Sequence, residues 1–264
     1  MANETRPYLP YLAALNPAQR EAVTAGIDPS GPLADPAALL IIAGAGSGKT
    51  HTLAHRVAHL VLHGAQADRI LLLTFTRRAA GEMVRRARRI QAEALAGAAA
   101  GGASPKPGTL HWAGTFHSVA NRLLRLHAES LNLDPAFTVL DRGDAADLLD
   151  LLRNDLGFAQ RAARFPRKAT CLAIYSHAVN AQQSVEDTLE RAFPWCEAWA
   201  EELKQLFAAF VEAKQRRHVL DYDDLLLYWY YLMEEPALAQ AVSERFDHVL
   251  VDEYQDTNAL QASV

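Results

Sequence analysis

The sequence predicts an α/β protein whose parallel sheet is interrupted by a long helical segment. Short apolar runs of strand type alternate with helical periodicity at both ends of the chain, which is typical of parallel strands joined by crossover helices. Between residues 141 and 217, apolar residues recur almost only at helical spacing. The 264 residues are 50% hydrophobic, enough for one large core or two smaller ones.

The first predicted element is a short helix that begins after Asn16. Asn is a good N-cap, Pro17 fits the first helical turn, and Gln19 stands where a capping box needs it. We expect this helix to end near Ala25, and the Pro- and Gly-rich residues 27–36 to form a loop.

Strands and helices then alternate. Leu39–Ala43 is an apolar run of buried-strand type, followed by a glycine-rich turn and a helix that ends near Gly64. A second strand, Arg69–Phe75, precedes a long helix. The low-complexity stretch Ala94–Gly108 should begin as helix and end as a flexible linker.

The pattern resumes with a strand at His111–Phe116 and a helix at His117–Leu131. After the helical segment, the apolar strand His248–Val251 ends in the acidic pair Asp252 and Glu253.

The glycine-rich turn AGAGSGKT, residues 43–50, matches the phosphate-binding loop pattern, with Ala43 where the general form has Gly. Glycines let backbone N–H groups turn toward phosphates at a helix N-terminus. Lys49 would reach the β- and γ-phosphates, and Thr50 would offer its hydroxyl to Mg²⁺. A turn without a ligand is the alternative, but the flanking strand and helix favour a site formed by Ala43, Gly44, Ala45, Gly46, Ser47, Gly48, Lys49 and Thr50.

The acidic pair in VLVDEYQD, residues 249–256, complements this loop. Asp252 would bind the metal and Glu253 would orient an attacking water, whereas solvated acids at a strand end are the alternative for this motif alone. Together the two motifs predict a nucleoside triphosphatase, with Lys49 and Glu253 as catalytic residues and with Thr50 and Asp252 as Mg²⁺ ligands.

Six segments in order closely resemble the UvrD/Rep/PcrA helicases of superfamily 1. They are LNPAQREAV (15–23), AGAGSGKT (43–50), LTFTRRAAGEM (73–83), WAGTFHSVANRLLR (112–125), LDYDDLL (220–226) and VDEYQDTNALQ (251–261). Each segment alone is ambiguous, but six in order are highly specific.

The resemblance implies a P-loop, RecA-like ATP-binding domain formed by residues 1–128 and 219–264, with an inserted all-helical subdomain at 129–218. It also implies ATP-driven 3′-to-5′ translocation on single-stranded DNA, unwinding at single/double-strand junctions, and a role such as DNA repair. The family's later motifs do not follow Val264. We therefore expect a chain truncated after the Asp-Glu strand that lacks its C-terminal RecA-like domain and is nearly inactive alone.

The resemblance assigns further nucleotide contacts. Gln19 matches the family's adenine-reading glutamine, a role compatible with helix capping. His51 stands where the family commonly has an Arg that packs against adenine, so stacking can persist without the permanent charge.

Two further segments match the family's contacts with single-stranded DNA: Thr74, Phe75 and Thr76 in one, and Thr115 and His117 in the other. Hydroxyls and strand-end backbone can bind phosphates, and Phe75 offers a face for base stacking. A core aromatic is the alternative for Phe75.

The net charge of −5 conceals a basic helix. Some of its arginines, Arg77 first, could contact DNA phosphates, with a solvated helix face as the alternative. The arginines are Arg77, Arg78, Arg85, Arg86, Arg88 and Arg89.

Two other interpretations of the function stay open. The chain could belong to a helicase–nuclease of the RecB/AddA type, or be a short ATP- and DNA-binding module without motor activity.

The remaining conspicuous residues have structural interpretations. Cys171 and Cys196 are expected to be free buried thiols, and His55, His59 and His63 a polar helix face rather than a metal ladder. We find neither a signal peptide nor an apolar run long enough for a membrane span, which predicts a cytosolic protein without a membrane partner.

Two sets of large side chains complete the expectations. Trp195 and Trp199, one helical turn apart, should lie in the core or pack within the helical insert rather than stack on bases. The cluster Lys214, Arg216 and Arg217 should lie at the surface.

Overall fold

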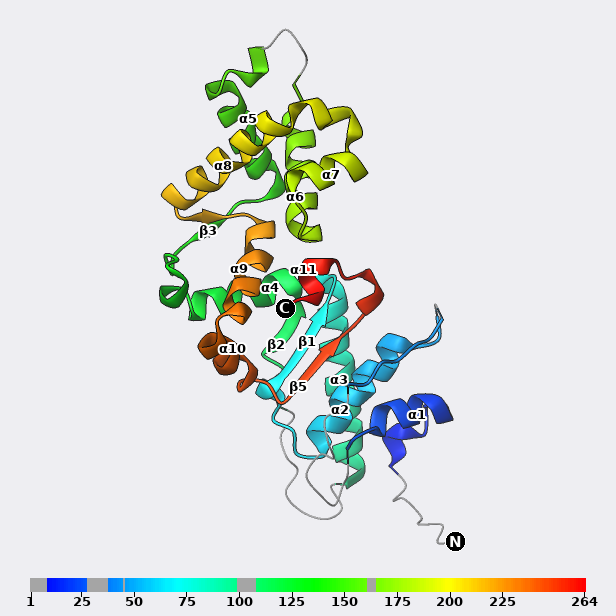
Figure 1. Cartoon of the computed structure of the whole chain (residues 1–264). Coiled ribbons are helices and arrows are strands. Elements are labelled where there is room, and N and C mark those ends of the chain that lie inside the picture. The colour runs from blue at the N-terminus through cyan, green and yellow to red at the C-terminus, as the bar shows by residue number, and fades with distance from the viewer. Residues whose placement is uncertain (1–8, 28–37, 45, 99–107, 161–164) are drawn as a thin grey trace. The chain divides into compact units, whose positions relative to one another are not determined.

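The computed structural model describes residues 9–27, 38–44, 46–98, 108–160 and 165–264 (Figure 1). Its contacts divide the chain into two compact units. The sheet unit comprises Met1–Thr115 and Val242–Tyr254, and the helical unit comprises Phe116–Ala241 and Gln255–Val264.

The sheet unit contains three parallel strands in the order β2-β1-β5, with bounds Ile70–Thr74 for β1, Trp112–Thr115 for β2 and His248–Val251 for β5. Thr74 of β1 pairs with Thr115 of β2, and Leu73 pairs with Val251 of β5. Because all three strands run the same way, their carboxyl ends meet at one edge. These three strands confirm the prediction of a parallel sheet.

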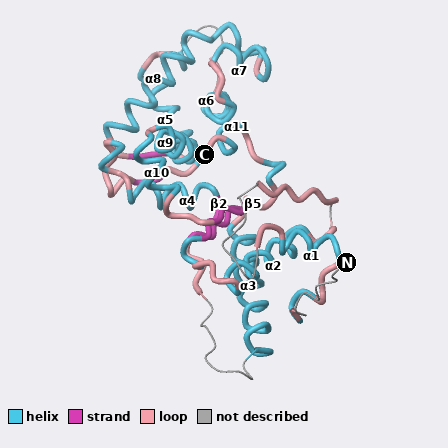
Figure 2. The backbone as a smooth tube through the Cα atoms, turned by 60° about the horizontal axis from the view of Figure 1, so that its bottom comes forward, coloured by secondary structure: helices cyan, strands magenta, loops and turns pink. Residues whose placement is uncertain are grey.

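Three helices accompany these strands, namely α1 (Pro17–Thr24), α2 (Lys49–Leu62) and α3 (Arg77–Ala98). Figure 2 shows them together on one side of the strands. Apolar side chains of α2 and α3 pack against the strands in a core that includes Val57, Ile70, Leu72, Met83 and Leu250. All three predicted helices are confirmed, and Asn16 forms the expected capping box with Gln19.

The prediction of a buried strand at Leu39–Ala43 is wrong in this structure. Within the described part of the chain these residues join no sheet, and Leu40 and Ile42 are 69% and 87% exposed. An apolar run supplies side chains for burial, but a strand also needs a hydrogen-bonded neighbour. The sheet here pairs β1 with β2 and β5 only.

Two predicted loops fall largely outside the described residues. These are residues 28–36 of the first loop and 99–107 of the low-complexity linker, whose start, Ala94–Ala98, is helical as expected.

Helices dominate the other unit. The principal ones are α4 (Phe116–Leu126), α5 (Arg142–Asp155), α6 (Lys168–Ala181), α7 (Val185–Ala192), α8 (Ala200–Arg216), α9 (Tyr222–Glu234) and α11 (Ala259–Ala262). Helix α10 (Pro236–Ser243) leads back into the sheet unit. The core between α5, α6, α7 and α8 contains Leu149, Ile174, Leu189, Leu206 and Phe210.

Short 3₁₀ turns connect the helices and strands. They are Pro10–Leu12, Ala67–Arg69, Glu129–Leu131, Phe158–Gln160, Pro194–Trp199 and Tyr254–Asp256.

The predicted helical stretch from 141 to 217 is confirmed for its described residues, and a small pairing encloses it. Strand β3 (Thr138–Val139) runs parallel to β4 (Val219–Leu220), a contact that the sequence analysis did not predict. Two residues per strand are too few to give a periodic signal.

The structure contradicts the predicted exposure of two side chains, Lys214 and Trp195. Lys214 was expected at the surface, but its side chain is 2% exposed because two carboxylates accompany it into the core. Trp195 was expected in the core but is 71% exposed, whereas Trp199 packs against the helical core. Trp195 lies in a 3₁₀ turn, where the α-helical spacing used for the prediction does not apply.

Two of the three α2 histidines are buried rather than part of a polar face. His55 Nδ1 lies 3.0 Å from the carbonyl oxygen of His51, and His59 Nδ1 lies 2.6 Å from the hydroxyl of Tyr11. Burial lowers the pKa of His59 to about 4, so its ring is neutral at pH 7. The described residues include no cluster of side chains suited to a metal ion.

Both cysteines are free and buried, as predicted. Among the described helices, none has the length and apolar character that a membrane span requires.

Candidate nucleotide-binding site

The glycine-rich loop folds tightly at the start of α2. Gly46 and Gly48 have φ angles of 74° and 87°, a region that favours glycine. The hydroxyl of Ser47 donates to the carbonyl of Gly44 at 2.6 Å, and α2 begins at Lys49. The loop therefore ends where unpaired N–H groups of a helix N-terminus are available to an anion. Ala45 lies outside the described residues.

Lys49 reaches back over the loop. Its Nζ donates to the carbonyl oxygens of Ala43 at 2.9 Å and Gly44 at 3.3 Å. A phosphate oxygen would be a stronger acceptor for the same ammonium, because it carries a negative charge that a carbonyl oxygen lacks.

Thr50 and Asp252 lie side by side although they come from opposite ends of the chain. The hydroxyl of Thr50 donates to Asp252 Oδ2 at 3.3 Å, and the backbone N–H of Asp252 donates to Leu73 O at 2.9 Å, which extends the β1–β5 ladder. Hydroxyl and carboxylate oxygens are ligands that Mg²⁺ accepts, with water completing the shell. These two side chains therefore fit a magnesium ion carried by a nucleotide.

The environment of Asp252 affects its ionisation. Burial, and next the negative charge of Glu253, raise the pKa of Asp252, while the hydroxyl of Thr50 opposes the shift. A cation at this position would remove that penalty, because an opposite charge favours the carboxylate.

Glu253 occupies an unusual backbone conformation. Its φ is +55°, a left-handed value uncommon for a residue other than glycine, and only Asp252 separates it from the end of β5. Such conformations persist where the surrounding structure imposes them, and they concentrate at functional sites.

Gln19 performs the predicted capping role and also touches the loop. Its Oε1 accepts from the backbone N–H of Asn16 at 3.0 Å, which leaves Nε2 to donate to the carbonyl of Ser47 at 3.0 Å. The structure therefore places this side-chain amide beside the glycine-rich loop.

His51 lies partly buried in the first turn of α2. Its ring is 4.2 Å from the ring of His55 in an edge contact. Burial, and then the charges of His55, Arg86 and Arg89, lower the pKa of His51, which is therefore neutral at pH 7. Arg86 and Arg89 belong to the α3 arginines of which some could contact DNA phosphates, and the charges of these two act on His51.

The carboxyl ends of β1 and β2 carry the predicted DNA-contacting residues of the sheet unit. Thr74 is buried, with its hydroxyl donating to Thr76 O at 3.0 Å, and Thr76 Oγ1 accepts from the N–H of Ala79 at the start of α3. Thr115 is the register partner of Thr74. Phe75 is half-buried, while Thr76 and Arg77 are exposed.

His117 belongs to the helical unit, in the first turn of α4. Its ring lies 5.6 Å from the ring of Tyr222 in a perpendicular contact. Burial lowers the pKa of His117, and the nearby Asp223 offsets part of that shift.

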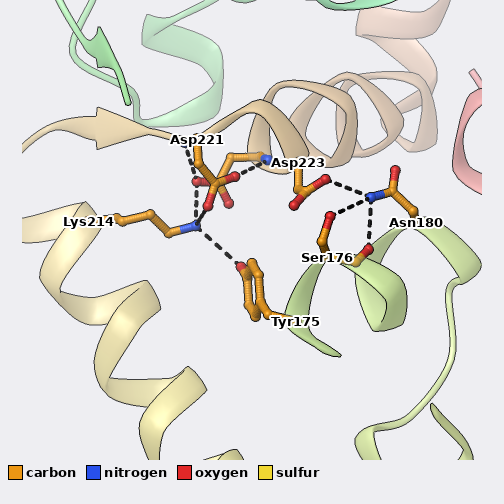
Figure 3. Close-up of polar contacts among 7 residues, drawn as sticks. Tyr175, Ser176, Asn180, Lys214, Asp221 and Asp223 are labelled. Carbon is orange, nitrogen blue, oxygen red and sulfur yellow. Dashed lines mark hydrogen bonds and ion pairs between the residues drawn. The ribbon is translucent and has the colours of Figure 1, made fainter. Parts of the chain in front are cut away.

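The helical unit contains a buried ionic cluster that was not predicted from the sequence (Figure 3). Lys214 Nζ lies 2.6 Å from Oδ2 of both Asp221 and Asp224, and 3.3 Å from the hydroxyl of Tyr175. The i,i+3 spacing of the two aspartates, which form the capping box of α9, was the available signal.

The fold and this geometry together define an α/β protein whose glycine-rich loop opens a helix and whose acidic pair follows a neighbouring parallel strand. The sequence profile of the UvrD/REP helicase N-terminal domain matches residues 15–264, and the chain belongs to this family.

Individual relatives support this assignment. The chain is 34% identical to DNA helicase II of Haemophilus influenzae and of Escherichia coli, over 95% of its own length and 31% of theirs. It is also 34% identical to ATP-dependent DNA helicase PcrA of Leuconostoc citreum, over 86% of this chain and 28% of that one. The chain thus spans about a third of the length of the curated relatives it matches.

Proposed function

We propose that this chain is the ATP-binding and DNA-contacting N-terminal part of an ATP-dependent DNA helicase. The observation that carries the proposal is the contact between Thr50 and Asp252, because it unites the glycine-rich loop and the acidic strand end in one site. Curated relatives are named DNA helicases, so neither a helicase–nuclease nor a module without motor activity is favoured.

ATP would lie on the loop at the start of α2. Backbone N–H groups from Ala43 to Thr50 would bind its phosphates, and Lys49 would exchange its carbonyl acceptors for phosphate oxygens. The amide of Gln19, already beside Ser47 O, would pair with the adenine edge, and His51 would stack on the base as a neutral ring.

Hydrolysis would use the acidic pair. Mg²⁺ supplies charge neutralisation when bound, and Thr50 and Asp252 would hold it. Glu253 would orient the attacking water, and Lys49 would stabilise the charge that develops on the transferred phosphoryl group.

Single-stranded DNA would cross the carboxyl ends of β1 and β2. Phe75 would offer its face to a base, and the backbone and exposed hydroxyl of Thr76 would receive phosphates together with Arg77. The buried Thr74 would act by shaping the strand end rather than by direct contact. Thr115 and His117 would complete the contacts.

We assign residues 1–128 and 219–264 to a RecA-like domain and residues 129–218 to an inserted helical subdomain. Translocation from 3′ to 5′, unwinding at junctions, a C-terminal RecA-like partner domain and a cytoplasmic location belong to the same proposal. They rest on the family and its named relatives.

Nucleotide binding provides the test. Replacing Lys49 by Ala should weaken Mg-ATP binding by roughly 2–4 kcal/mol, the scale of removing one partner of a buried charged hydrogen bond. Replacing Glu253 by Gln should leave that affinity largely intact while stopping any hydrolysis. Calorimetry on the two variants checks both, and equal ATP affinity in the wild type and Lys49→Ala would exclude the assignment.

A further inference from the structure

The side-chain amide of Asn180 in the helical unit has hydrogen-bond partners at both its nitrogen and its oxygen, and Figure 3 shows the contacts of the nitrogen. Asn180 of α6 donates from Nδ2 to Asp223 Oδ1 of α9 at 2.6 Å and to the carbonyl of Ser176 at 2.8 Å. Its Oδ1 accepts from Nδ2 of Asn258 at 2.8 Å. Three part-buried side chains therefore form a row of hydrogen bonds in which Asn258 donates to Asn180 and Asn180 donates to Asp223.

One end of this row fixes the chain that follows the acidic pair. Asn258 caps α11, with its Oδ1 accepting from the N–H of Gln261 at 2.7 Å. In the sequence Asn258 comes shortly after Glu253. The segment that leaves the proposed catalytic pair is thus held at its far end by α6.

The other end of the row lies beside a residue of the proposed DNA surface. Helix α9 packs against α4, where the ring of Tyr222 contacts the ring of His117 at 5.6 Å. Asp223 follows Tyr222 and is near enough to His117 to influence its ionisation. A ligand that moves His117 would therefore act on α9 next to Asp223.

We propose that Asn180 is a positioning residue that couples DNA binding at His117 to nucleotide binding at the Asp252–Glu253 pair. The inference rests on the proposed function, since it needs both ligands. The amide of Asn180 donates to a carboxylate through its nitrogen and accepts from a second amide through its oxygen. A carboxylate in its place keeps the acceptor but loses the donor.

Two single substitutions break the row at different points. Asn180→Asp removes the donor to Asp223 and places two carboxylates together. Asn258→Asp removes the donor to Asn180 but preserves the helix cap, because Asp and Asn are equally good N-caps. The double variant Asn180→Asp/Asp223→Asn exchanges donor and acceptor, so the amide now donates from α9 to α6.

A matched control is available on α5. Asn154 is exposed and donates to the carbonyl of Asp150 at 2.8 Å, as Asn180 does to Ser176. Asn154→Asp therefore changes the same functional group in the same helical setting, outside the row.

The measurement is thermodynamic coupling in the whole chain. Calorimetry with a non-hydrolysable ATP analogue and Mg²⁺ is done with and without a single-stranded oligonucleotide, and an oligonucleotide titration is done with and without the analogue. In the wild type and in Asn154→Asp, each ligand should change the affinity of the other by the same factor, roughly 5-fold or more. In Asn180→Asp and Asn258→Asp this coupling factor should fall to unity, while the affinity for each ligand alone stays unchanged. In the double variant the coupling factor should return to the wild-type value.

The outcomes distinguish failure of the proposed role of Asn180 from failure of the proposed function, the binding of ATP and DNA. Failure of the wild type to bind either ligand would overturn both. Three other outcomes would overturn the role of Asn180 alone. The wild type could bind both ligands without coupling, or coupling could survive in folded Asn180→Asp or Asn258→Asp. In the third outcome, a folded double variant does not regain the coupling.

Discussion

The ammonium of Lys214 lies 2.6 Å from Oδ2 of Asp221, and both side chains are almost fully buried. A second carboxylate, Asp224, lies at the same distance from this cation. Burial alone would lower the pKa of Lys214, but the charges of Asp224 and Asp221 outweigh it, so the pKa is raised and the lysine is charged at every physiological pH. One cation is thus shared by two carboxylates in a core of aromatic rings.

Removing this cation should destabilise the helical unit severely. Lys214→Met leaves two buried carboxylates without a counter-charge, and breaking a buried pair in this way costs about 3–5 kcal/mol. The loss should be smaller at pH 5 than at pH 8, because protonation of one carboxylate relieves the repulsion. Urea unfolding followed by circular dichroism at both pH values checks this.

Arg216→Met is the matched control, since Arg216 lies on the same helix but is largely exposed, 3.8 Å from Glu212. Surface substitutions of this kind change stability by about 0.5 kcal/mol or less. Equal losses in the two variants would show that burial of Lys214 has no energetic consequence.

Asp224 should give stability a specific pH dependence. Burial, and next the charge of Asp221, raise the pKa of Asp224 to about 6. Its unfolded value is about 3.9, so between about pH 4 and 6 the folded state binds more protons and stability falls as pH rises. The fall attributable to this group is roughly 2–3 kcal/mol. Asp224→Asn should flatten the stability curve in this window, and an unchanged slope would contradict the assignment.

Gly48→Ala should alter which nucleotide is preferred. The backbone there has φ of 87°, and an added Cβ would lie 2.9 Å from Nε2 of Gln19. The substitution therefore strains the loop, by about 1–2 kcal/mol, and displaces the amide proposed to read adenine. Calorimetric titration with ATP and GTP should show weaker binding of both and a smaller preference for ATP.

Gly46→Ala separates the two effects. Gly46 has a similar φ of 74°, but an added Cβ meets nothing within 4 Å. Gly46→Ala should weaken the binding of ATP and of GTP equally and leave the ratio of the two affinities unchanged. A preference retained in Gly48→Ala, or lost in Gly46→Ala, would argue against Gln19 as the selecting group.

Phe75→Ala should weaken single-strand binding without changing sequence preference. Loss of one base–aromatic stack costs about 1–3 kcal/mol. Fluorescence anisotropy with two oligonucleotides of different sequence measures it. Phe246→Ala is the comparison, because Phe246 is also half-buried but packs against Trp112 before β5 begins. If the two variants bind alike while folded, Phe75 is a packing residue.

Arg77→Ala should change the salt dependence of single-strand binding rather than base stacking. Removing one arginine–phosphate ion pair should reduce the slope of log affinity against log salt by roughly 0.7 for a single strand. Arg86→Ala should leave that slope unchanged, because Arg86 pairs with Glu82 and its charge acts on His51. Equal slopes for the wild type, Arg77→Ala and Arg86→Ala would show that Arg77 does not contact a DNA phosphate.

Local signals predicted most of the fold. The capping box at Asn16 and Gln19, the helix after Gly48 and the apolar strands around Leu72 and Leu250 each depend on neighbouring residues and formed as expected. The run Leu39–Ala43 failed because its pattern describes only the side chains, whereas a strand depends on a partner elsewhere in the chain.

The sequence by itself determined the family, the glycine-rich and acidic-pair motifs, and the order of the principal helices and of strands β1, β2 and β5, because these reside in short contiguous segments. The sequence predicted Thr50 and Asp252 as ligands of one metal ion, and they are in contact in the structure. Tertiary structure alone decided that Lys214 is buried between two aspartates, and that Asn180 joins Asp223 to Asn258. Each of these contacts is formed by side chains from different elements. These contacts depend on packing that brings separate elements together and removes them from water. A local pattern such as the i,i+3 spacing of Asp221 and Asp224 therefore indicates a helix cap but not the partner that the carboxylates meet.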